Sequence, residues 1–224
     1  MGYIAFIPAR SGSRRIKNKN IINLNQKPLI YYTINAAKKS KFIKKIFVST
    51  DSEKIKKISE IYNCNIDKLR PKYLAGDNVS MHKLLKKTII MEKKQFKKFK
   101  YLVLLQPTSP LRTFKDIDNA CKKFEKFKDK IDSLISTYKI KKILNIKKTM
   151  IGNKDFIIQL KKKNDKKSKK LYHRNGPAII ILKIKNIKKF LLGKKICNFE
   201  MSQKKSIDIN YYKDLKQVKT TLGL

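Results

Sequence analysis

The first half of the chain alternates short apolar runs with segments whose apolar residues recur at helical spacing. Residues 3–7, 46–49, 101–105 and 133–138 predict β-strands, and residues 28–39, 52–61, 80–93 and 114–128 predict helices between them. This alternation predicts an α/β fold with a mainly parallel sheet and helices on both faces. Ligands of such sheets bind beyond the carboxyl ends of the strands, so the loops at 10–20, 75–80 and 106–112 are expected to meet at one edge.

The alternation of strand and helix patterns stops between residues 139 and 171. This stretch holds short β-like pieces, such as 156–158, and a run at 161–170 with seven lysines in ten residues, which predicts a solvated loop. A buried strand is expected at 177–182, a short helix at 187–192 and a last helix from about Lys213. Without an internal repeat, residues 1–224 are expected to form a single domain in which 139–171 is an insertion.

The net charge of +41 suggests a polyanionic partner. However, the lysines are spread over every segment alongside abundant isoleucine and asparagine, and arginines do not interleave with aromatic residues. We therefore expect no specific nucleic-acid partner, only weak adhesion to polyanions at low salt. No apolar run is long enough for a membrane span, and the first residues lack the layout of a signal peptide. A cytoplasmic protein is expected, with Cys64, Cys121 and Cys197 as reduced, mostly buried thiols.

The first predicted strand runs directly into a basic glycine- and serine-containing loop, residues 7–20, IPARSGSRRIKNKN. Such a loop offers backbone N–H groups and several cations at one end of a strand, which suits a triphosphate. The candidate phosphate-binding residues are Arg10, Ser11, Gly12, Ser13, Arg14 and Lys19, with Gly12 permitting a positive φ. The alternative is an exposed β-to-α turn. Neither the P-loop pattern nor the dinucleotide fingerprint follows this strand, which excludes the P-loop NTPases and the Rossmann dehydrogenases.

Three further blocks follow at 105–112 (LQPTSPLR), 172–178 (YHRNGPA) and 206–210 (SIDIN). In order and spacing, the four blocks resemble the CMP-sialic acid synthetase family, the cytidylyltransferases of nonulosonic acids. The resemblance covers nearly the whole chain, and its most specific parts are IPARSGSRRIKNKN and LQPTSPLR. It implies a Rossmann-like nucleotidyltransferase sheet, a homodimer paired through the 139–171 arm, CTP as a substrate and Mg²⁺ as the cofactor.

The resemblance also implies roles for single residues around the nucleotide. It places the β- and γ-phosphates of CTP on the basic loop, with Arg10 and Lys19 as catalytic residues that balance the pyrophosphate leaving group. Asn20, Arg70 and Ser80 are candidates for holding cytosine and ribose, since an amide and a guanidinium suit the acceptors of cytosine. Ser80 matches the family less well, and the alternative role is a helix N-cap.

For the acceptor sugar, the resemblance implies that Gln106 lies near the reacting carbon, in a turn shaped by Pro107, Pro110, Thr108, Ser109 and Arg112. Relatives carry an aromatic residue, an arginine, any residue and then Asn-Gly, and in that register His173 takes the arginine position. We therefore assign the sugar carboxylate to Arg174. Neither His173 nor His82 is expected to act as a general base.

Asp208 and Asn210 would point to one face of an extended strand. The family pattern has aspartate at both places, and that pair binds Mg²⁺. The carbonyl oxygen of Asn210 can still ligate a metal but carries no charge, so Asp208 is predicted to be the main protein ligand and a catalytic residue. The alternative role for Asp208 is a turn or cap residue.

The expected reaction is transfer of CMP from CTP to the anomeric hydroxyl of a nonulosonic acid, which gives the CMP-sugar and pyrophosphate. One alternative is activation of another acidic sugar, such as a 3-deoxy-octulosonate, and the LQPTSPLR block argues against it. The other alternative is a non-catalytic protein that binds nucleotides or nucleic acid, which the departures at His173 and Asn210 leave open.

Overall fold

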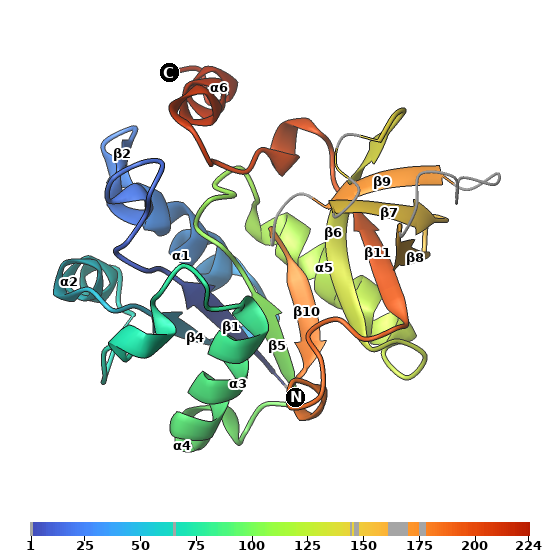
Figure 1. Ribbon diagram of the computed structural model, residues 1–224, viewed down its shortest axis with the longest axis horizontal. Helices are drawn as coiled ribbons and strands as arrows, with labels where there is room; N and C mark the ends of the chain where they lie inside the picture. The colour runs from blue at the N-terminus through green and yellow to red at the C-terminus, as the bar shows by residue number, and fades with distance from the viewer. Residues whose placement is uncertain (1, 65, 144, 146–147, 161–169, 175–177) are drawn as a thin grey trace.

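A nine-stranded mixed sheet forms the centre of the molecule, as seen in a computed structural model that describes residues 2–64, 66–143, 145, 148–160, 170–174 and 178–224 (Figure 1). The strand order is β11-β8-β7-β9-β6-β10-β5-β1-β4, and a separate small ribbon pairs β2 with β3. The bounds of the strands are β1 (Tyr3–Pro8), β2 (Asn23–Leu24), β3 (Lys27–Pro28), β4 (Ile43–Ser49), β5 (Tyr101–Leu104), β6 (Ser133–Ile140), β7 (Thr149–Gly152), β8 (Phe156–Gln159), β9 (Lys170–Arg174), β10 (Ile180–Lys183) and β11 (Ile196–Glu200).

The predicted mainly parallel sheet is wrong for half of the molecule. Strands β4, β1 and β5 run parallel, and β11 is parallel to β6, but β10 runs antiparallel to both β5 and β6. Strands β7, β8 and β9 also pair antiparallel with their neighbours. The physical reason is that, in the described part of the chain, no α-helix lies between β6 and β11. Strands joined without a helical crossover pair antiparallel, as in the hairpin of β7 and β8.

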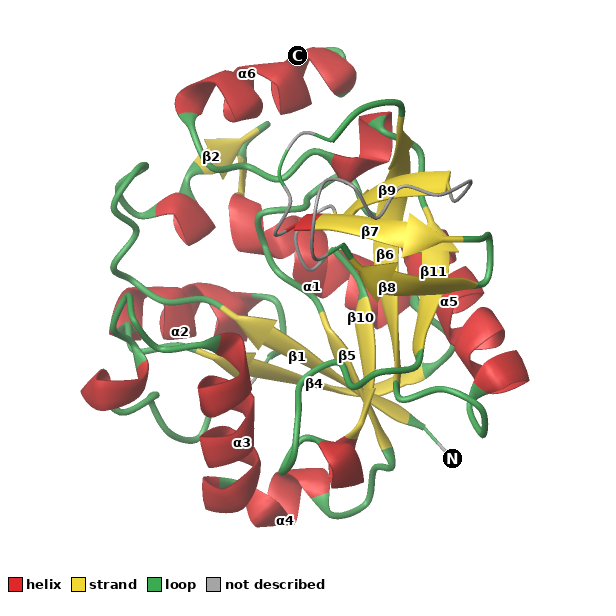
Figure 2. Cartoon of the chain, turned by 45° about the vertical axis from the view of Figure 1, so that its right-hand side comes forward, coloured by secondary structure: helices red, strands yellow, loops and turns green. Residues whose placement is uncertain are grey.

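Helices cover both faces of the sheet, as predicted. Alternate residues of β1 point to opposite faces, so Ala5 belongs to one apolar cluster and Phe6 to the other. The first cluster packs against α1 (Leu29–Lys39), α2 (Glu53–Ile61) and α5 (Phe114–Phe127), and the second against α3 (Met81–Met91) and α4 (Lys93–Phe96). Figure 2 shows α3 on the opposite side of β1 and β5 from α1. Cys64, Cys121 and Cys197 are buried free thiols, as expected.

Side-chain caps mark where two of the predicted helices begin. Ser52 accepts a hydrogen bond from the backbone N–H of Ile55 at the start of α2, and Thr113 and Asp116 form a capping box at the start of α5. The predicted helix at 187–192 is wrong, because these residues form turns and bends that follow the short 3₁₀ turn η4 (Ile184–Asn186). Gly193, at φ +75°, ends this stretch before enough residues are available to nucleate an α-helix.

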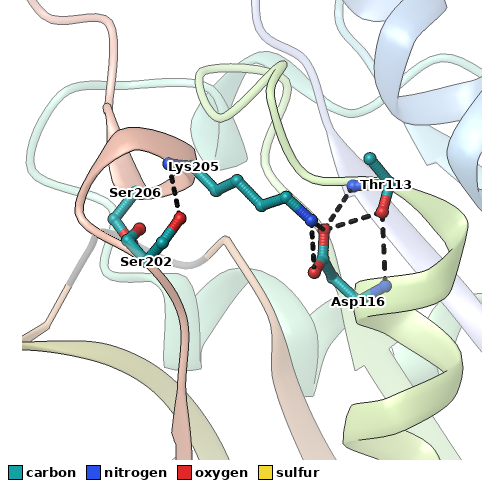
Figure 3. Close-up of polar contacts among 5 residues, drawn as sticks. All are labelled: Thr113, Asp116, Ser202, Lys205 and Ser206. Atoms are coloured by element: carbon teal, nitrogen blue, oxygen red, sulfur yellow. Dashed lines mark hydrogen bonds and ion pairs between the residues drawn. The ribbon is translucent and has the colours of Figure 1, made fainter.

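The C-terminal segment crosses back over the carboxyl ends of the central strands. After β11 comes the 3₁₀ turn η5 (Lys204–Ser206), and then α6 (Tyr212–Thr221), which packs on a third apolar cluster with Ile16, Leu24 and Leu29. Figure 3 shows how the segment is fastened: Lys205 Nζ lies 3.0 and 3.1 Å from the two carboxylate oxygens of Asp116. The segment that carries Asp208 is thereby tied to the start of α5.

The predicted arm at 139–171 contributes β7 and β8 to the main sheet. The lysine run at 161–169 lies outside the described residues. Across the described part of the chain, no helix is long and apolar enough to span a membrane.

Candidate active site

The carboxyl ends of β1 and β5 open into a cavity of about 450 Å³. Its walls come from the loop after β1, the segment before α3, the loop after β5 and the C-terminal segment. Among its lining residues are these sequence-predicted site residues: Arg10, Ser13, Arg14, Lys19, Asn20, Arg70, Gln106 and Asn210. The structure therefore brings together residues from all three predicted loops and the C-terminal segment, as the strand-end rule requires.

Two arginines of the basic loop share one carboxylate. Arg10 Nη2 lies 2.5 Å from Asp77 Oδ1, and Arg14 Nε pairs with the other carboxylate oxygen of Asp77. Arg10 Nη1 also donates to the carbonyl oxygen of Ala75 at 3.1 Å. The hydrogen bond from Arg10, together with both positive charges, lowers the pKa of Asp77. The Asp77 carboxylate thus pairs with two of the cations that were predicted to bind phosphate.

The tip of the basic loop turns away from the cavity. Ser11 donates from both its backbone N–H and its hydroxyl to Asp51, at 2.9 and 2.6 Å, and neither Ser11 nor Gly12 lines the cavity. Gly12 does not use the positive φ or the close approach that its missing side chain permits: it is not among the residues with positive φ, and an added Cβ would meet no atom within 4 Å. The left-handed residue in this loop is Asn18, at φ 54°.

Lys19 lies in the cavity wall, where the loop ends in the 3₁₀ turn η1 (Lys19–Ile21). Its Nζ donates to the carbonyl oxygen of Ile209 at 2.8 Å, which ties the basic loop to the C-terminal segment. Burial lowers the pKa of Lys19, while the nearby charge of Asp208 opposes that shift. A desolvated cation in this position is well suited to stabilise charge on a bound anion.

The residues predicted to hold cytosine lie deeper in the wall. Asn20 is buried, and its amide donates to the carbonyl oxygen of Arg10 at 2.9 Å. Arg70 is also buried and donates to the hydroxyl and the carbonyl oxygen of Ser49. Burial lowers the pKa of Arg70 to about 10. Ser80 does not line the cavity; its hydroxyl accepts from the backbone N–H of Lys83, the N-cap role that was the alternative for this residue.

Gln106 lines the cavity at the end of β5, and Thr108 Oγ1 contacts its amide oxygen at 3.4 Å, a long hydrogen bond. The turn beneath it is held by Arg112, whose side chain is buried and donates to the carbonyl oxygen of Ala178 at 2.8 Å and to Thr33 Oγ1 at 2.7 Å. The predicted role of Arg112 in shaping this turn is consistent with these bonds.

Arg174 ends β9, opposite Thr137 of β6, and does not line the cavity. It projects to the same face as Tyr172, whose ring packs in the cluster that also contains cavity residues Leu74 and Leu84. Burial lowers the pKa of the Arg174 guanidinium. Residues 175–177 of the predicted sugar-binding block lie outside the described part of the chain.

The two histidines take no part in the cavity lining. His173 packs against the ring of Tyr138, with 5.4 Å between ring centroids, and its pKa is lowered by burial and by the charges of Lys148 and Arg174. A ring nitrogen of His82 contacts the carbonyl oxygen of Ile187 at 2.7 Å. Both rings thus lie outside the cavity lining.

Asp208 and Asn210 lie side by side in the C-terminal segment. Asn210 Nδ2 donates to Asp208 Oδ2 at 2.9 Å, while Asn210 Oδ1 accepts from Arg15 at 3.3 Å. The amide oxygen of Asn210 thus faces Arg15, so this geometry does not support Asn210 as a metal ligand beside Asp208. Among the described residues, Asp208 Oδ1 is buried without a hydrogen-bond partner, and no cluster of three or more histidine, cysteine or acidic side chains has a metal-binding arrangement.

Sequence reasoning missed three residues of this site: Asp51, Asp77 and Arg15. Asp51 and Asp77 face the basic loop from other elements, and Arg15 contacts a residue 195 positions away. No local pattern marks the two acids. Arg15 was visible as one of several cations in the loop, but nothing nearby in the sequence separates it from Lys17.

Comparison with known proteins gives consistent results. A family model described as cytidylyltransferase matches residues 4–222. N-acylneuraminate cytidylyltransferase of Escherichia coli is 33% identical over 210 residues, which cover 92% of this chain and 49% of that protein. CMP-N,N'-diacetyllegionaminic acid synthase of Legionella pneumophila is 38% identical over 120 residues, 54% of this chain and 52% of that protein. The chain spans about half the length of these relatives. The resemblance to CMP-sialic acid synthetases is thereby confirmed.

Solved structures agree on the fold. The structure of a CMP:2-keto-3-deoxy-manno-octonic acid synthetase complexed with CTP superposes with a TM-score of 0.77 at 13% identity, covering 100% of this chain and 99% of that one. A 4-diphosphocytidyl-2C-methyl-D-erythritol synthase from Anaerococcus prevotii superposes with a TM-score of 0.67 at 14% identity, covering 100% and 96%. At these identities the likeness concerns the fold alone, and it confirms an α/β nucleotidyltransferase fold.

Proposed function

The chain belongs to the cytidylyltransferase family, and on this premise we propose that it transfers CMP from CTP to the anomeric hydroxyl of a nonulosonic acid. The products are the CMP-sugar and pyrophosphate. The observation that carries the proposal is the convergence of Arg10, Arg14 and Lys19 with Gln106 and the Asn210 segment on one cavity. Relatives named N-acylneuraminate cytidylyltransferase and CMP-N,N'-diacetyllegionaminic acid synthase support this class of acceptor.

In the proposed reaction, the anomeric hydroxyl gives its proton to a bound water while its oxygen attacks the α-phosphorus in line, and the bond from that phosphorus to the bridging oxygen of the β-phosphate breaks. Negative charge accumulates on the departing pyrophosphate, which Arg10 and Lys19 would stabilise. Lys19 is suited to this task because its bond to Ile209 holds it in place and its partial burial strengthens its field. For Arg10 to act, its guanidinium must exchange Asp77 for phosphate oxygens.

Asp208 would hold the catalytic Mg²⁺. Its buried oxygen Oδ1, which has no partner among the described residues, is the kind of acceptor that a Mg²⁺ ion satisfies. When bound, the ion would withdraw charge from the phosphates. A single protein carboxylate is enough where phosphates and water supply the other oxygens, as is usual for Mg²⁺ sites. The Asn210 amide donates a hydrogen bond to the Asp208 carboxylate, and Lys19 supplies a positive charge near it.

The nucleotide base and the acceptor sugar would contact different residues of the site. Asn20 and Arg70 line the cavity and are proposed to read cytosine. Gln106 is proposed to contact the sugar near its reacting carbon. Arg174, on the same face of the sheet as the apolar cavity wall, is proposed to pair with the sugar carboxylate.

We also propose a homodimer formed through the hairpin of β7 and β8. Phe156 and Ile158 of β8 are 40% and 50% exposed, and an apolar hollow lies beside them. Large apolar side chains gathered on one exposed hairpin are a usual mark of an interface. Sedimentation analysis of Ile158→Lys against the unchanged chain would test this, because a lysine there should shift the protein toward monomer.

A pyrophosphate-release assay tests the proposed reaction. The protein is incubated with Mg²⁺, with CTP or UTP, and with N-acetylneuraminate, legionaminate, pseudaminate or a 3-deoxy-octulosonate. We expect release with CTP and at least one nonulosonic acid, and little with UTP. Release with the octulosonate alone would overturn the acceptor class. Equal turnover of UTP would overturn the roles of Asn20 and Arg70.

A further inference from the structure

Arg15 is fixed at the cavity wall although it lies on an exposed loop. Its Nη1 donates to Asn210 Oδ1 at 3.3 Å, and its Cζ lies 4.9 Å from the centre of the Tyr211 ring. The first contact is a charge-assisted hydrogen bond and the second a cation–π interaction. Together they hold the guanidinium against the segment that carries Asp208.

The orientation of the Asn210 amide follows from its two neighbours. Its Nδ2 lies 2.9 Å from Asp208 Oδ2 and 3.2 Å from the carbonyl oxygen of Asp208, both acceptors. Its Oδ1 faces the Arg15 guanidinium, which only donates. Turning the amide over would place an oxygen against a carboxylate and an NH₂ group against a guanidinium, so the chemistry allows one orientation. An aspartate at this position could not make the same bond to Asp208, because a carboxylate has no N–H donor.

The backbone beneath this bridge is held from several sides. Asp214 Oδ2 accepts from the backbone N–H groups of Asn210 and Tyr211, both at 2.8 Å. The neighbouring Ile209 donates to the carbonyl oxygen of Thr108 and accepts from Lys19, also at 2.8 Å each. The anchor for Arg15 is therefore organised before any ligand binds, which reduces the entropy cost of using that cation.

We propose that Asn210 is a polar bridge that holds Arg15 as a further phosphate-binding residue, an inference that rests on the proposed function and deepens it. Among the described residues, one of the five N–H donors of Arg15 has a protein partner, which leaves a guanidinium edge for a polyphosphate. The phosphates are the favoured ligand because Arg15 lies in the same loop as Arg10 and Arg14, and all three line the cavity with Lys19. Asn210 then forms hydrogen bonds to Arg15 and to Asp208 at the same time and does not act as a metal ligand.

The test is titration calorimetry of inorganic pyrophosphate and of CTP, without acceptor sugar and at constant ionic strength. The variants are Arg15→Met, Asn210→Leu and the two combined, with Lys17→Met as the matched control. Lys17 is exposed on the same loop and does not line the cavity. We expect Arg15→Met to weaken pyrophosphate binding about tenfold, the scale of one charge-assisted bond, and Lys17→Met to change it less than about twofold. Asn210→Leu should weaken binding less than Arg15→Met does.

The proposed bridge also predicts how the effects of the two substitutions on binding combine. Once Arg15 is gone, losing Asn210 should weaken binding little further, so the two changes should be clearly non-additive. Additive effects, or an Arg15→Met protein that binds pyrophosphate as well as Lys17→Met does, would overturn the proposal. Asn210→Ala repeats the test if the leucine variant has a lowered thermal midpoint.

Steady-state kinetics separates this inference from the proposed function. Arg15→Met should raise KM for CTP and leave KM for the acceptor acid unchanged, and Arg15→Lys should restore part of the loss. A raised KM for the acid alone would mean that Arg15 contacts the sugar carboxylate, which contradicts the proposal. Failure of the unchanged protein to release pyrophosphate with any acid would defeat the proposed function, while the calorimetric result for Arg15 would still stand.

Discussion

Asp77 Oδ1 lies 2.5 Å from Arg10 Nη2, across the mouth of the candidate active site. The two residues are 67 positions apart, and Asp77 comes from the segment between the 3₁₀ turn η2 (Lys72–Leu74) and α3. A carboxylate therefore lies where the proposed reaction needs a phosphate oxygen. CTP must displace this pair to reach Arg10.

Removing the charge of Asp77 should strengthen nucleotide binding. Asp77→Asn keeps the shape of the side chain but frees Arg10 and Arg14 from ion pairs that solvent screens and that are weak for this reason. We expect KM for CTP to fall roughly two- to fivefold. Initial rates against CTP concentration measure this, with Asp67→Asn, an exposed acid outside the cavity, as the control. A raised KM would mean that Asp77 contributes to binding CTP.

Removing either proposed leaving-group cation should slow the reaction. Arg10→Ala and Lys19→Ala should each lose about 2–4 kcal/mol of transition-state stabilisation, the scale for a preorganised charged donor. The measurement is kcat/KM for CTP, compared with Lys17→Ala as the loss of a cation outside the cavity. Near-normal turnover in both active-site variants would place the triphosphate elsewhere.

The pKa of Lys19 predicts an alkaline limit on activity. Burial lowers this pKa, so the ammonium loses its proton at a lower pH than an exposed lysine does. Below that pKa, Lys19 is charged and can stabilise pyrophosphate; above it, the charge is lost and kcat/KM should fall. Lys19→Arg stays charged across this range, so its alkaline limb should move to higher pH. Superimposable pH profiles of the two proteins would argue against a catalytic charge at Lys19.

The two residues of the Asp208 segment should respond in opposite directions. Asp208→Asn should nearly abolish activity, because the proposed Mg²⁺ site loses its carboxylate. Asn210→Asp should preserve or raise Mg²⁺ affinity, since two neighbouring carboxylates repel each other until a cation lies between them. Titration of activity with Mg²⁺ measures both. Unchanged Mg²⁺ dependence in Asp208→Asn would show that the metal site is elsewhere, and weaker Mg²⁺ binding by Asn210→Asp would refute the second expectation.

Local pattern was enough to predict the elements that build the candidate site. The apolar run of β1, the helical spacing of α1 and the start of α2 at Ser52 are set by residues close together in the chain. The position of the basic loop after β1 and of Gln106 after β5 then implied a shared edge of the sheet, and the structure places both in one cavity.

Three features escaped sequence reasoning because they depend on which segments meet. The direction of β10 was missed, because periodicity describes a strand but not the neighbour with which it pairs. Ser80 was left with two possible roles until its hydroxyl was seen to cap α3. The helix predicted at 187–192 is replaced by turns, because a short isolated helix has only marginal stability unless it packs against other elements.

The sequence by itself determined that the chain has an α/β core, a cationic loop after its first strand and a family resemblance that points to CTP. Only the tertiary structure decided how those cations are used. It placed Asp77 against Arg10, Ile209 against Lys19 and Asn210 between Arg15 and Asp208. The physical reason is that charges and amides bind partners within a few ångströms in space, and the packing of distant segments creates those distances.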